Sequence, residues 1–223
     1  MDRTSWLRDR RAAVVADYDD EAATYEDDAY PVETQHGFVA RLLETCPPGG
    51  VVLDAPCGTG PYFAQVAASG RRVVGADQSA GMLAMARARG IADALHHVGL
   101  QELAFDHEFD GVMTVDAMEN VFPEDWPLVL SNLHRAARPG ATLYLTVEEI
   151  DASAIDAADV EQRARGWPSV LGEVIEGDTA GYHYYPGRDR VRGWLASEGL
   201  AIVAEDTSTY DDWAYWHLLV RDA

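Results

Sequence analysis

Apolar residues follow two different periods along the chain, and the change of period divides it. In residues 1 to about 46 they recur near helical spacing, at Trp6, Leu7, Val14 and Tyr18 and again at Phe38, Val39, Leu42 and Leu43. The run of prolines and glycines at 47–50 then stops the helical pattern. We therefore expect a helical N-terminal lid over residues 1–46 that is distinct from residues 47–223.

Beyond this breaker, short apolar runs alternate with helical patterns. Strands are predicted at 51–53, 72–76, 111–115 and 142–147, with helices at 61–69 and 79–90 and a third ending near 138. Such alternation is typical of an α/β fold with a parallel sheet and right-handed crossovers. The tail predicts two closing strands, at 200–204 and 215–220, which a linker at 206–212 allows to be antiparallel. Residues 150–187 have the weakest pattern, and we expect them to form an insertion covering the carboxyl edge of the sheet.

The charge of the chain narrows its chemistry. Among 223 residues, 38 are acidic and 17 are basic, which gives a net charge of −21, and every basic residue is arginine. Without lysine there is no Schiff base to a carbonyl cofactor and no phosphate-binding P-loop. A chain this acidic can hardly assemble the cationic patch that nucleic acid requires. The expected partner is a small molecule that is neutral or cationic.

The N-terminal residues, the lengths of the apolar stretches and the two cysteines indicate the cellular compartment. The first residues lack a cationic start followed by an apolar run, and no apolar stretch approaches the roughly 18 residues that span a membrane. Cys46 and Cys57 form neither a disulfide framework nor a zinc pattern. These features favour a reduced, cytoplasmic protein with no membrane partner. We expect it to be a monomer or a homodimer.

The sharpest motif lies at residues 51–60, where a buried strand ends in Asp54 and a glycine turn with Gly58 and Gly60 leads into a helix. Glycines allow the backbone to approach a ligand closely. A dinucleotide fingerprint would carry a third glycine, but Pro61 and the two aromatic residues after it stand there instead. A carboxylate would also repel a pyrophosphate. The alternative is that Asp54 only caps the turn.

A second carboxylate, Asp77, ends the next predicted strand, 17 positions after Gly60. An acidic residue at this place is positioned to accept the two hydroxyls of a ribose. Ser79 is the better candidate for capping the following helix. Asp54 and Asp77 together therefore predict a ligand that contains a ribose and carries an ammonium group at its other end.

With these residues in view, the chain resembles the class I S-adenosylmethionine-dependent methyltransferases, particularly those acting on small molecules. Residues 53–60 resemble the first motif of that family and 74–83 the second. Residues 103–105 and 109–116 resemble the approach to and the body of its fourth strand, and 133–141 the helix and turn before the fifth. Tyr18, Asp19 and Tyr25 resemble its tyrosine-rich N-terminal lid.

This resemblance implies a Rossmann-like sheet of seven strands in the order 3-2-1-4-5-7-6, with five parallel strands, an antiparallel last strand and helices on both faces. It implies that Asp54 holds the methionine ammonium, that Asp77 holds the ribose, and that Gln78 and Met82 flank the adenine. The family often has an acidic residue near the adenine amino group, at a position that aligns with Gly99 here. The cofactor contacts it predicts are Tyr25, Asp54, Ala55, Gly58, Gly60, Asp77, Gln78, Met82, Leu100, Gln101 and Val115.

For the methyl acceptor, the expected walls come from the lid, the segment after the fourth strand and the insertion. The predicted catalytic residues are His183, Glu119 and Asp116, with His183 as the preferred general base because imidazole titrates near neutral pH. His217 is a substitute for it. Other candidate wall residues are Tyr25, Tyr30, Asn120, Trp126 and 182–186. The alternation at 182–185 also fits an ordinary covering strand. No metal site is predicted, since His96 and His97 would face opposite sides of a strand.

The leading hypothesis is thus methyl transfer from S-adenosylmethionine to an oxygen, nitrogen or carbon of a small molecule, leaving S-adenosylhomocysteine. Two alternatives remain open. The chain could be a cofactor-binding or regulatory protein without catalysis, because fold alone does not establish function. It could also be an NAD-dependent oxidoreductase, which the missing third glycine disfavours.

Overall fold

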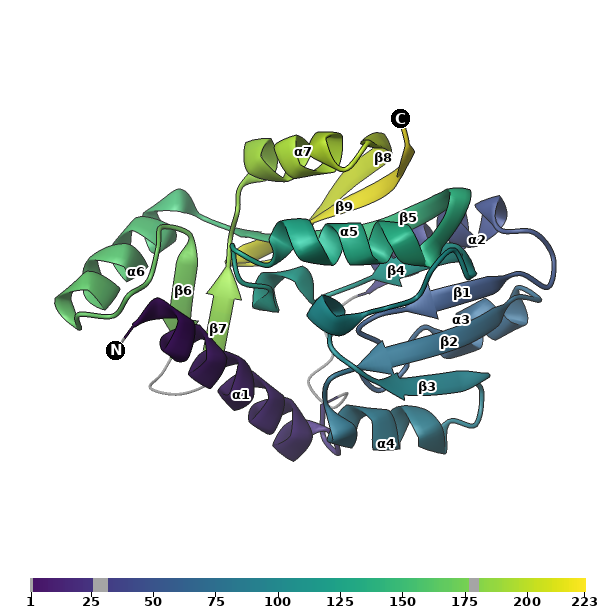
Figure 1. The fold of residues 1–223 in the computed structure, drawn as a ribbon, viewed down its shortest axis with the longest axis horizontal. Coiled ribbons are helices and arrows are strands. Elements are labelled where there is room, and N and C mark those ends of the chain that lie inside the picture. Colours follow the sequence, from purple (N-terminus) through teal and green to yellow (C-terminus); the bar gives the residue numbers. More distant parts are fainter. Residues whose placement is uncertain (1, 26–31, 177–180) are drawn as a thin grey trace.

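A twisted seven-stranded sheet forms the centre of the protein in a computed structural model that describes residues 2–25, 32–176 and 181–223 (Figure 1). Its strand order is β3-β2-β1-β4-β5-β9-β8. Strands β1 to β5 are parallel, whereas β9 is antiparallel to both β5 and β8. The predicted fold class and strand order are confirmed. The strands are β1 (Val51–Asp54), β2 (Arg72–Asp77), β3 (Ala94–His97), β4 (Phe109–Thr114), β5 (Ala137–Ile150), β8 (Leu200–Thr209) and β9 (Trp213–Asp222).

Helices cover both faces of the sheet. Successive strand residues point to opposite sides, and apolar side chains on both sides have to be buried. Leu53 and Val112 pack in one buried cluster with α5 and α7, whereas Val52 and Met113 pack in the other with α2, α3 and α4. None of these four side chains is more than 1% exposed, so both layers are closed to water. The helices are α1 (Arg3–Glu21), α2 (Glu33–Thr45), α3 (Phe63–Ala68), α4 (Ala80–Ala88), α5 (Trp126–Ala136), α6 (Ala152–Ala164) and α7 (Arg188–Ser197), with 3-10 turns η1 (Leu100–Glu102) and η2 (Met118–Asn120).

Several element boundaries differ from the sequence prediction. The helix after the glycine turn begins at Phe63 rather than at Pro61, because the chain first makes a turn in which the Phe63 N–H donates to the Gly60 carbonyl at 3.2 Å. Strands β5, β8 and β9 are longer than predicted, and the β8–β9 linker shrinks to residues 210–212. Strand β3 had no clear pattern, since its residues are only half-buried or exposed.

Residues 150–187 contain α6 and a separate two-stranded sheet of β6 (Glu173–Glu176) and β7 (Gly181–Tyr184). The N-terminal end of α1 packs against this small sheet, beside β7 in Figure 1. The rings of Trp6 and Tyr182 meet edge to face with centroids 6.4 Å apart, and Arg3 bonds to the buried Glu173 at 2.7 Å. The Tyr182 hydroxyl donates to the same carboxylate at 2.7 Å. The division into a lid and a larger domain stays a prediction.

Strand β8 ends the sheet on one side and pairs with β9. The pairing register shifts between Ile202 and Ala204, so that Val203 forms a β-bulge. Val203 is 47% exposed there. Beyond the bulge, Glu205 and Asp206 continue the strand with exposed carboxylates.

Candidate functional site

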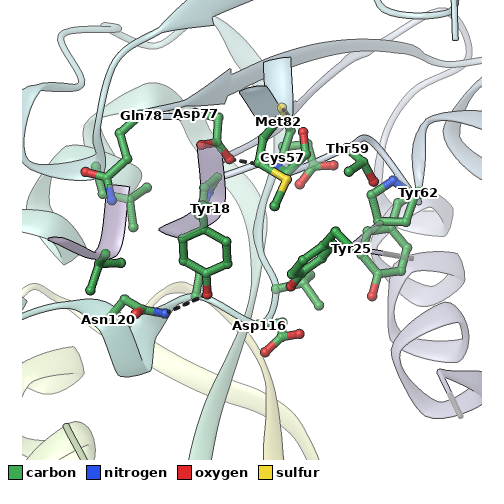
Figure 2. A pocket seen from close by; sticks show the side chains of 18 of the residues that line it. Tyr18, Tyr25, Cys57, Thr59, Tyr62, Asp77, Gln78, Met82, Asp116 and Asn120 are labelled. Carbon is green, nitrogen blue, oxygen red and sulfur yellow. Dashed lines mark hydrogen bonds between the residues drawn. The ribbon is translucent and has the colours of Figure 1, made fainter. Parts of the chain in front are cut away.

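A cavity of about 470 Å³ opens at the carboxyl ends of β1, β2 and β4 and is closed on the other side by α1 and the start of α2 (Figure 2). Ligands in open α/β sheets bind at this edge, where the strand order reverses between β1 and β4. Ten of the predicted site residues lie on its wall: Tyr25, Asp54, Gly58, Asp77, Gln78, Met82, Leu100, Gln101, Val115 and Asp116. Ala55, Gly60, Glu119 and His183 are not among the wall residues.

The glycine turn after β1 depends on two left-handed backbone conformations. Gly58 has φ +52° and Gly60 has φ +81°, values that other residues adopt only with strain. A Cβ atom on Gly60 would also lie 2.6 Å from the ring of Phe63, the first residue of α3. Gly60 therefore shapes the turn from behind, whereas Gly58 faces the cavity.

Asp54 is a buried carboxylate with one unpaired oxygen atom. It is 1% exposed and lies on the cavity wall, and its Oδ2 atom has no hydrogen-bond partner among the described residues. Burial, and next the nearby charge of Asp77, hold its pKa well above the usual value. An unpaired buried carboxylate is costly, and a cationic group in the cavity would offset that cost.

Asp77 is better compensated, because two backbone groups hold its carboxylate. Its Oδ2 accepts from the Gly58 N–H at 2.8 Å and its Oδ1 accepts from the Ser79 N–H at 2.8 Å. Burial still raises its pKa, against the opposing effect of these bonds. Each oxygen keeps a second lone pair, so the carboxylate can accept from ligand hydroxyls while it fixes the glycine turn. Ser79 caps α4, as predicted, by accepting from the Met82 N–H at 3.0 Å.

The space beside Gly99 is taken by Arg11 of α1. A Cβ atom on Gly99 would lie 2.3 Å from Nη2 of Arg11. The guanidinium donates to both oxygens of Glu102, at 2.7 and 2.6 Å, and to Oε1 of Gln78 at 3.1 Å. Sequence reasoning missed Arg11, because its partners are 67 and 91 positions away and α1 carries no local motif.

Aromatic side chains form the lid side of the cavity. The Tyr18 hydroxyl accepts from Nδ2 of Asn120 at 3.3 Å, and its ring meets that of Tyr25 edge to face at 5.9 Å. Tyr62, which sequence reasoning did not place in the site, lies on the wall beside His36, with ring centroids 5.3 Å apart. The predicted wall residue Tyr30 lies outside the described residues.

The predicted catalytic residues Asp116 and Glu119 lie next to one another after β4. Asp116 is on the wall with φ +55°, an uncommon conformation for a residue with a side chain, and its N–H donates to Oγ1 of Thr146 at 2.8 Å. Glu119, on η2, is 4% exposed, and its Oε2 atom has no hydrogen-bond partner among the described residues. Burial, then the charges of Asp116 and Glu148, hold its pKa well above the usual value.

His183 and His217, the two histidines predicted as bases, lie away from the cavity wall. Nδ1 of His183 is 3.2 Å from Oε2 of Glu148 and 2.9 Å from the Tyr185 hydroxyl. His217 is fully buried between Tyr144 and Ser208, and burial lowers its pKa to about 4. Trp126 is buried against Trp194, with ring centroids 5.1 Å apart, and is not a wall residue.

The described residues show neither a metal site nor a membrane-spanning helix. No three side chains of His, Cys, Asp or Glu in this part of the chain are arranged to hold a metal ion. None of the helices that the structure describes is long and apolar enough to cross a membrane.

Comparison with known sequences finds one family description and several named relatives. A family model described as a methyltransferase domain matches residues 52–140. A demethylmenaquinone methyltransferase from Corynebacterium kroppenstedtii is 30% identical over 161 residues, which cover 71% of this chain and 67% of the relative. A malonyl-[acyl-carrier protein] O-methyltransferase from Erwinia pyrifoliae is 34% identical over 152 residues, 66% of this chain and 56% of the relative. The chain spans about half the length of the malonyl O-methyltransferases that it matches.

Comparison with solved structures supports the fold. The chain superposes on a 1,6-didemethyltoxoflavin-N1-methyltransferase from Burkholderia thailandensis, solved with 1,6-didemethyltoxoflavin and S-adenosylhomocysteine, with a TM-score of 0.72 and 17% identity over 100% of this chain and 91% of the other. An S-adenosylmethionine-dependent methyltransferase from Methanosarcina mazei gives a TM-score of 0.69 with 16% identity, over 87% of this chain and 98% of the other. At these identities the likeness shows the shared fold.

Proposed function

Because the chain belongs to the class I S-adenosylmethionine-dependent methyltransferases, we propose that it transfers a methyl group from S-adenosylmethionine to a small molecule and releases S-adenosylhomocysteine. One observation carries this proposal: the unpaired Oδ2 atom of Asp54 lies, almost fully buried, on the wall of a cavity beside a glycine turn. The ammonium of the methionine moiety supplies the cation that this carboxylate lacks. The cavity volume falls in the ordinary range for small-molecule sites, roughly 300–1,000 Å³.

The residues around the turn fit the remainder of such a ligand. Gly58 leaves the cavity open beside Asp54, since a Cβ atom there would meet nothing within 4 Å and the space stays available to a ligand. The free lone pairs of Asp77 would accept the ribose hydroxyls. Ala55 and Gly60, which are not wall residues, would contribute through the shape of the turn rather than by contact.

The adenine would lie between α4 and η1. Met82, Gln78, Leu100 and Gln101 all line the cavity there and would flank the ring, and Val115 and Tyr25 are also on the wall. Asn132 of α5 fixes η1 by donating to the carbonyls of Leu100 and Gln101 at 3.0 and 2.9 Å. Arg11 fills the space beside Gly99, the position at which the family often has an acidic residue, and it also donates to Gln78. The amino edge of the adenine would therefore contact a different set of groups.

The sulfonium of the bound cofactor supplies an already activated methyl group. The chain's own residues therefore need mainly to align the acceptor and exclude water, and orientation of this kind lowers the barrier by several kcal/mol. Of the predicted catalytic residues, Asp116 is on the wall and would contact the acceptor. Glu119 would act through Asp116 and Asn120, and His183 through Glu148, because a general base must lie within hydrogen-bond reach of the proton it removes.

The names of the relatives support a small-molecule acceptor. They are named for a malonyl group on a carrier protein, for demethylmenaquinone and for 1,6-didemethyltoxoflavin, which are chemically unlike one another. These names therefore do not identify the acceptor of this chain, which has to be inferred from the residues that line its cavity. The monomeric or dimeric state and the cytoplasmic compartment stay predictions.

Titration calorimetry with S-adenosylmethionine, S-adenosylhomocysteine and NAD tests the proposal. We expect the first two to bind and NAD not to bind. An Asp54→Asn variant should bind both methionine derivatives more weakly, whereas Asp93→Asn, a change at an exposed carboxylate paired with Arg72, should not. Binding of NAD alone would overturn the proposal. Tight cofactor binding without methyl transfer to any acceptor would favour the non-catalytic alternative.

A further inference from the structure

Two glutamine side chains on the cavity wall are each oriented by a charged partner. Gln78 follows β2 and Gln101 lies on η1, and both line the part of the cavity proposed for the adenine. A glutamine amide has an acceptor, Oε1, and a donor, Nε2, so its hydrogen-bond partners decide which of the two a ligand meets. Here the two partners carry opposite charges, and the two amides therefore present opposite groups.

Arg11 of α1 orients the Gln78 amide. Its Nε donates to Oε1 of Gln78 at 3.1 Å, and because a guanidinium has no acceptor, only the amide oxygen can meet it. Gln78 therefore presents Nε2, a donor, to a ligand. The guanidinium is itself held by Glu102, to which Nη1 and Nη2 donate at 2.7 and 2.6 Å. This bidentate pair limits rotation of Arg11 away from Gln78.

Asp125 orients the Gln101 amide in the opposite sense. Its Oδ2 accepts from Nε2 of Gln101 at 3.2 Å, which leaves Oε1 of Gln101, an acceptor, as the group that meets a ligand. Asn132 holds the backbone of the same residue by donating to the Gln101 carbonyl at 2.9 Å. Asp125 precedes α5, but its side chain makes no capping bond to that helix. Its bond to Gln101 is therefore separate from the start of α5.

The side chains that orient the two amides form one connected group. Gln78 and Glu102 meet the same guanidinium, and Glu102 is the residue after Gln101. The bonds to Glu102, and further the charges of Glu102 and Asp125, raise the pKa of Arg11. Asp125 therefore lies near enough to act on the same guanidinium. The donor of Gln78 and the acceptor of Gln101 thus belong to one small region of the wall.

Adenine carries the matching pattern along one edge. Its exocyclic amino group donates, and the ring nitrogens on either side of that group accept. Figure 2 shows Gln78 next to Asp77, which is proposed to hold the ribose, so the base of the same nucleoside would reach this region. A 6-oxopurine has an oxygen in place of the amino group. That oxygen would face Oε1 of Gln101 with no proton between them, which leaves two acceptors unpaired.

We infer that Gln78 and Gln101 together select a 6-aminopurine over a 6-oxopurine as the base of the cofactor. Arg11 and Asp125 are the positioning residues that give the two amides their polarity. This inference rests on the proposed function, which it deepens by assigning the groups that recognise the base. Two neutral amides replace the acidic residue that the family often has at the position of Gly99. Base selection then depends on α1, which supplies Arg11.

Titration calorimetry of the unaltered protein with S-adenosylhomocysteine and S-inosylhomocysteine tests the selection. We expect the inosyl compound, a 6-oxopurine, to bind about 10–100 times more weakly, because a hydrogen bond is replaced by two facing acceptors. The 3-deaza analogue of S-adenosylhomocysteine is altered away from the amino edge and should bind like the parent compound. Equal binding of the adenosyl and inosyl compounds, or an equal loss with the 3-deaza analogue, would overturn the inference. Failure of S-adenosylhomocysteine to bind would instead refute the proposed function.

Two variants test the positioning residues through the ratio of the adenosyl to the inosyl affinity. Arg11→Ala and Asp125→Asn each free one amide to rotate, so each should lower this ratio by about threefold or more. A residue with only a structural role would weaken both compounds equally and leave the ratio unchanged. Arg8→Ala, at an exposed residue of the same helix paired with Asp9, is the control and should not change the ratio. An unchanged ratio in either test variant would overturn the inference.

A double variant separates orientation from other effects of Asp125. A carboxylate can only accept when it is ionised, so Gln101→Glu needs no partner to present an acceptor to the amino group. Adding Gln101→Glu to Asp125→Asn should therefore restore the preference for the adenosyl compound. A double variant with no more preference than Asp125→Asn alone would contradict the positioning role of Asp125.

Discussion

The two sides of the cavity are built differently. On the sheet side, backbone hydrogen bonds hold the wall: the Cys57 N–H donates to the Ala76 carbonyl at 2.8 Å, and the Ala55 N–H donates to the Met113 carbonyl at 2.9 Å. On the α1 side, side chains do this work. Arg11 bonds to Glu102, and Asp19 accepts from the Ser79 hydroxyl at 2.6 Å and from the Gly81 N–H at 2.8 Å.

This difference indicates which part of the site is insensitive to salt concentration. Strand register fixes the sheet side, and buried backbone bonds are little affected by salt. The bonds that hold α1 are partly exposed ion pairs and caps, which salt screens and which contribute about 0–1 kcal/mol each. The cofactor side should therefore be rigid, and the lid should be adjustable.

The largest expected effect is on the sheet side, at the glycine turn. Gly60→Ala would place a Cβ atom 2.6 Å from the Phe63 ring at a φ of +81°. Overpacking and left-handed strain together should lower the free energy of unfolding by about 2–4 kcal/mol, as measured by urea denaturation. Gly49→Ala has a similar φ of +74° with nothing within 4 Å, so it isolates the strain alone. Equal losses in both variants would contradict a role for the Phe63 contact.

The next effect is on cofactor affinity. Asp77→Ala removes the carboxylate that holds the Gly58 N–H and that would accept the ribose hydroxyls. Calorimetry should show S-adenosylhomocysteine binding weakened by about 1–3 kcal/mol. Asp77→Asn, which keeps the shape and one acceptor oxygen, should lose less. Unchanged affinity in a folded Asp77→Ala protein would move the ribose site elsewhere.

A smaller effect should appear in the dependence of stability on pH. The pKa of Asp54 is higher in the folded protein than in the unfolded chain, so the folded state holds this proton more tightly. The ligand-free protein therefore loses stability as the pH rises through the pKa of the folded state. Asp54→Asn removes this loss. The variant should be about 1–2 kcal/mol more stable than the unaltered protein at pH 7, and the difference should vanish near pH 4. Glu119 is present in both proteins, so its titration cancels. A difference that stays constant across this range would contradict the assignment.

The smallest effect is expected at the lid. Arg11→Ala breaks the contacts to Glu102 and Gln78 and should weaken cofactor binding by about 0.5–1 kcal/mol in dilute buffer. In the unaltered protein, high salt should remove most of the same increment, whereas the variant should respond little. Arg8→Ala, at an exposed residue paired with Asp9, is the control. A salt response equal in the variant and the unaltered protein would show that α1 is not held by this pair.

The same comparison explains how far the sequence could predict the molecule. The sheet side follows from local patterns, since apolar strands that end in Asp54 and Asp77 are brought together by the rule that parallel strands align their carboxyl ends. Fold class and the Ser79 cap were predicted in this way, whereas the strand order was implied by the resemblance to the methyltransferase family. Strand β3 was missed because it is only half-buried, and no alternation of apolar residues marks it.

The lid side could not be predicted as far. Arg11 reaches Glu102 across 91 positions, and nothing in either local sequence indicates that they meet. His183 was preferred as a base from the chemistry of imidazole, but the structure places it against Glu148 and Tyr185, off the cavity wall. Its position depends on how β7 packs against η2. This tertiary contact cannot be predicted from the local sequence of residues 150–187, whose pattern of apolar residues is weak. The catalytic roles stay predictions.

The bulge in β8 has a consequence for how copies of this chain meet. An open sheet edge is a template for pairing with another chain, and it can lead to aggregation. At Val203 the ladder is out of register, and Glu205, which is paired with Arg192, and the exposed Asp206 follow. A second edge strand would therefore find both a misaligned backbone and the charge of Asp206. The charge barrier weakens as the solution approaches the isoelectric point near 4.4, whereas the misalignment does not. Acidification therefore removes the electrostatic protection of this edge against pairing, whereas the protection from the misaligned backbone remains.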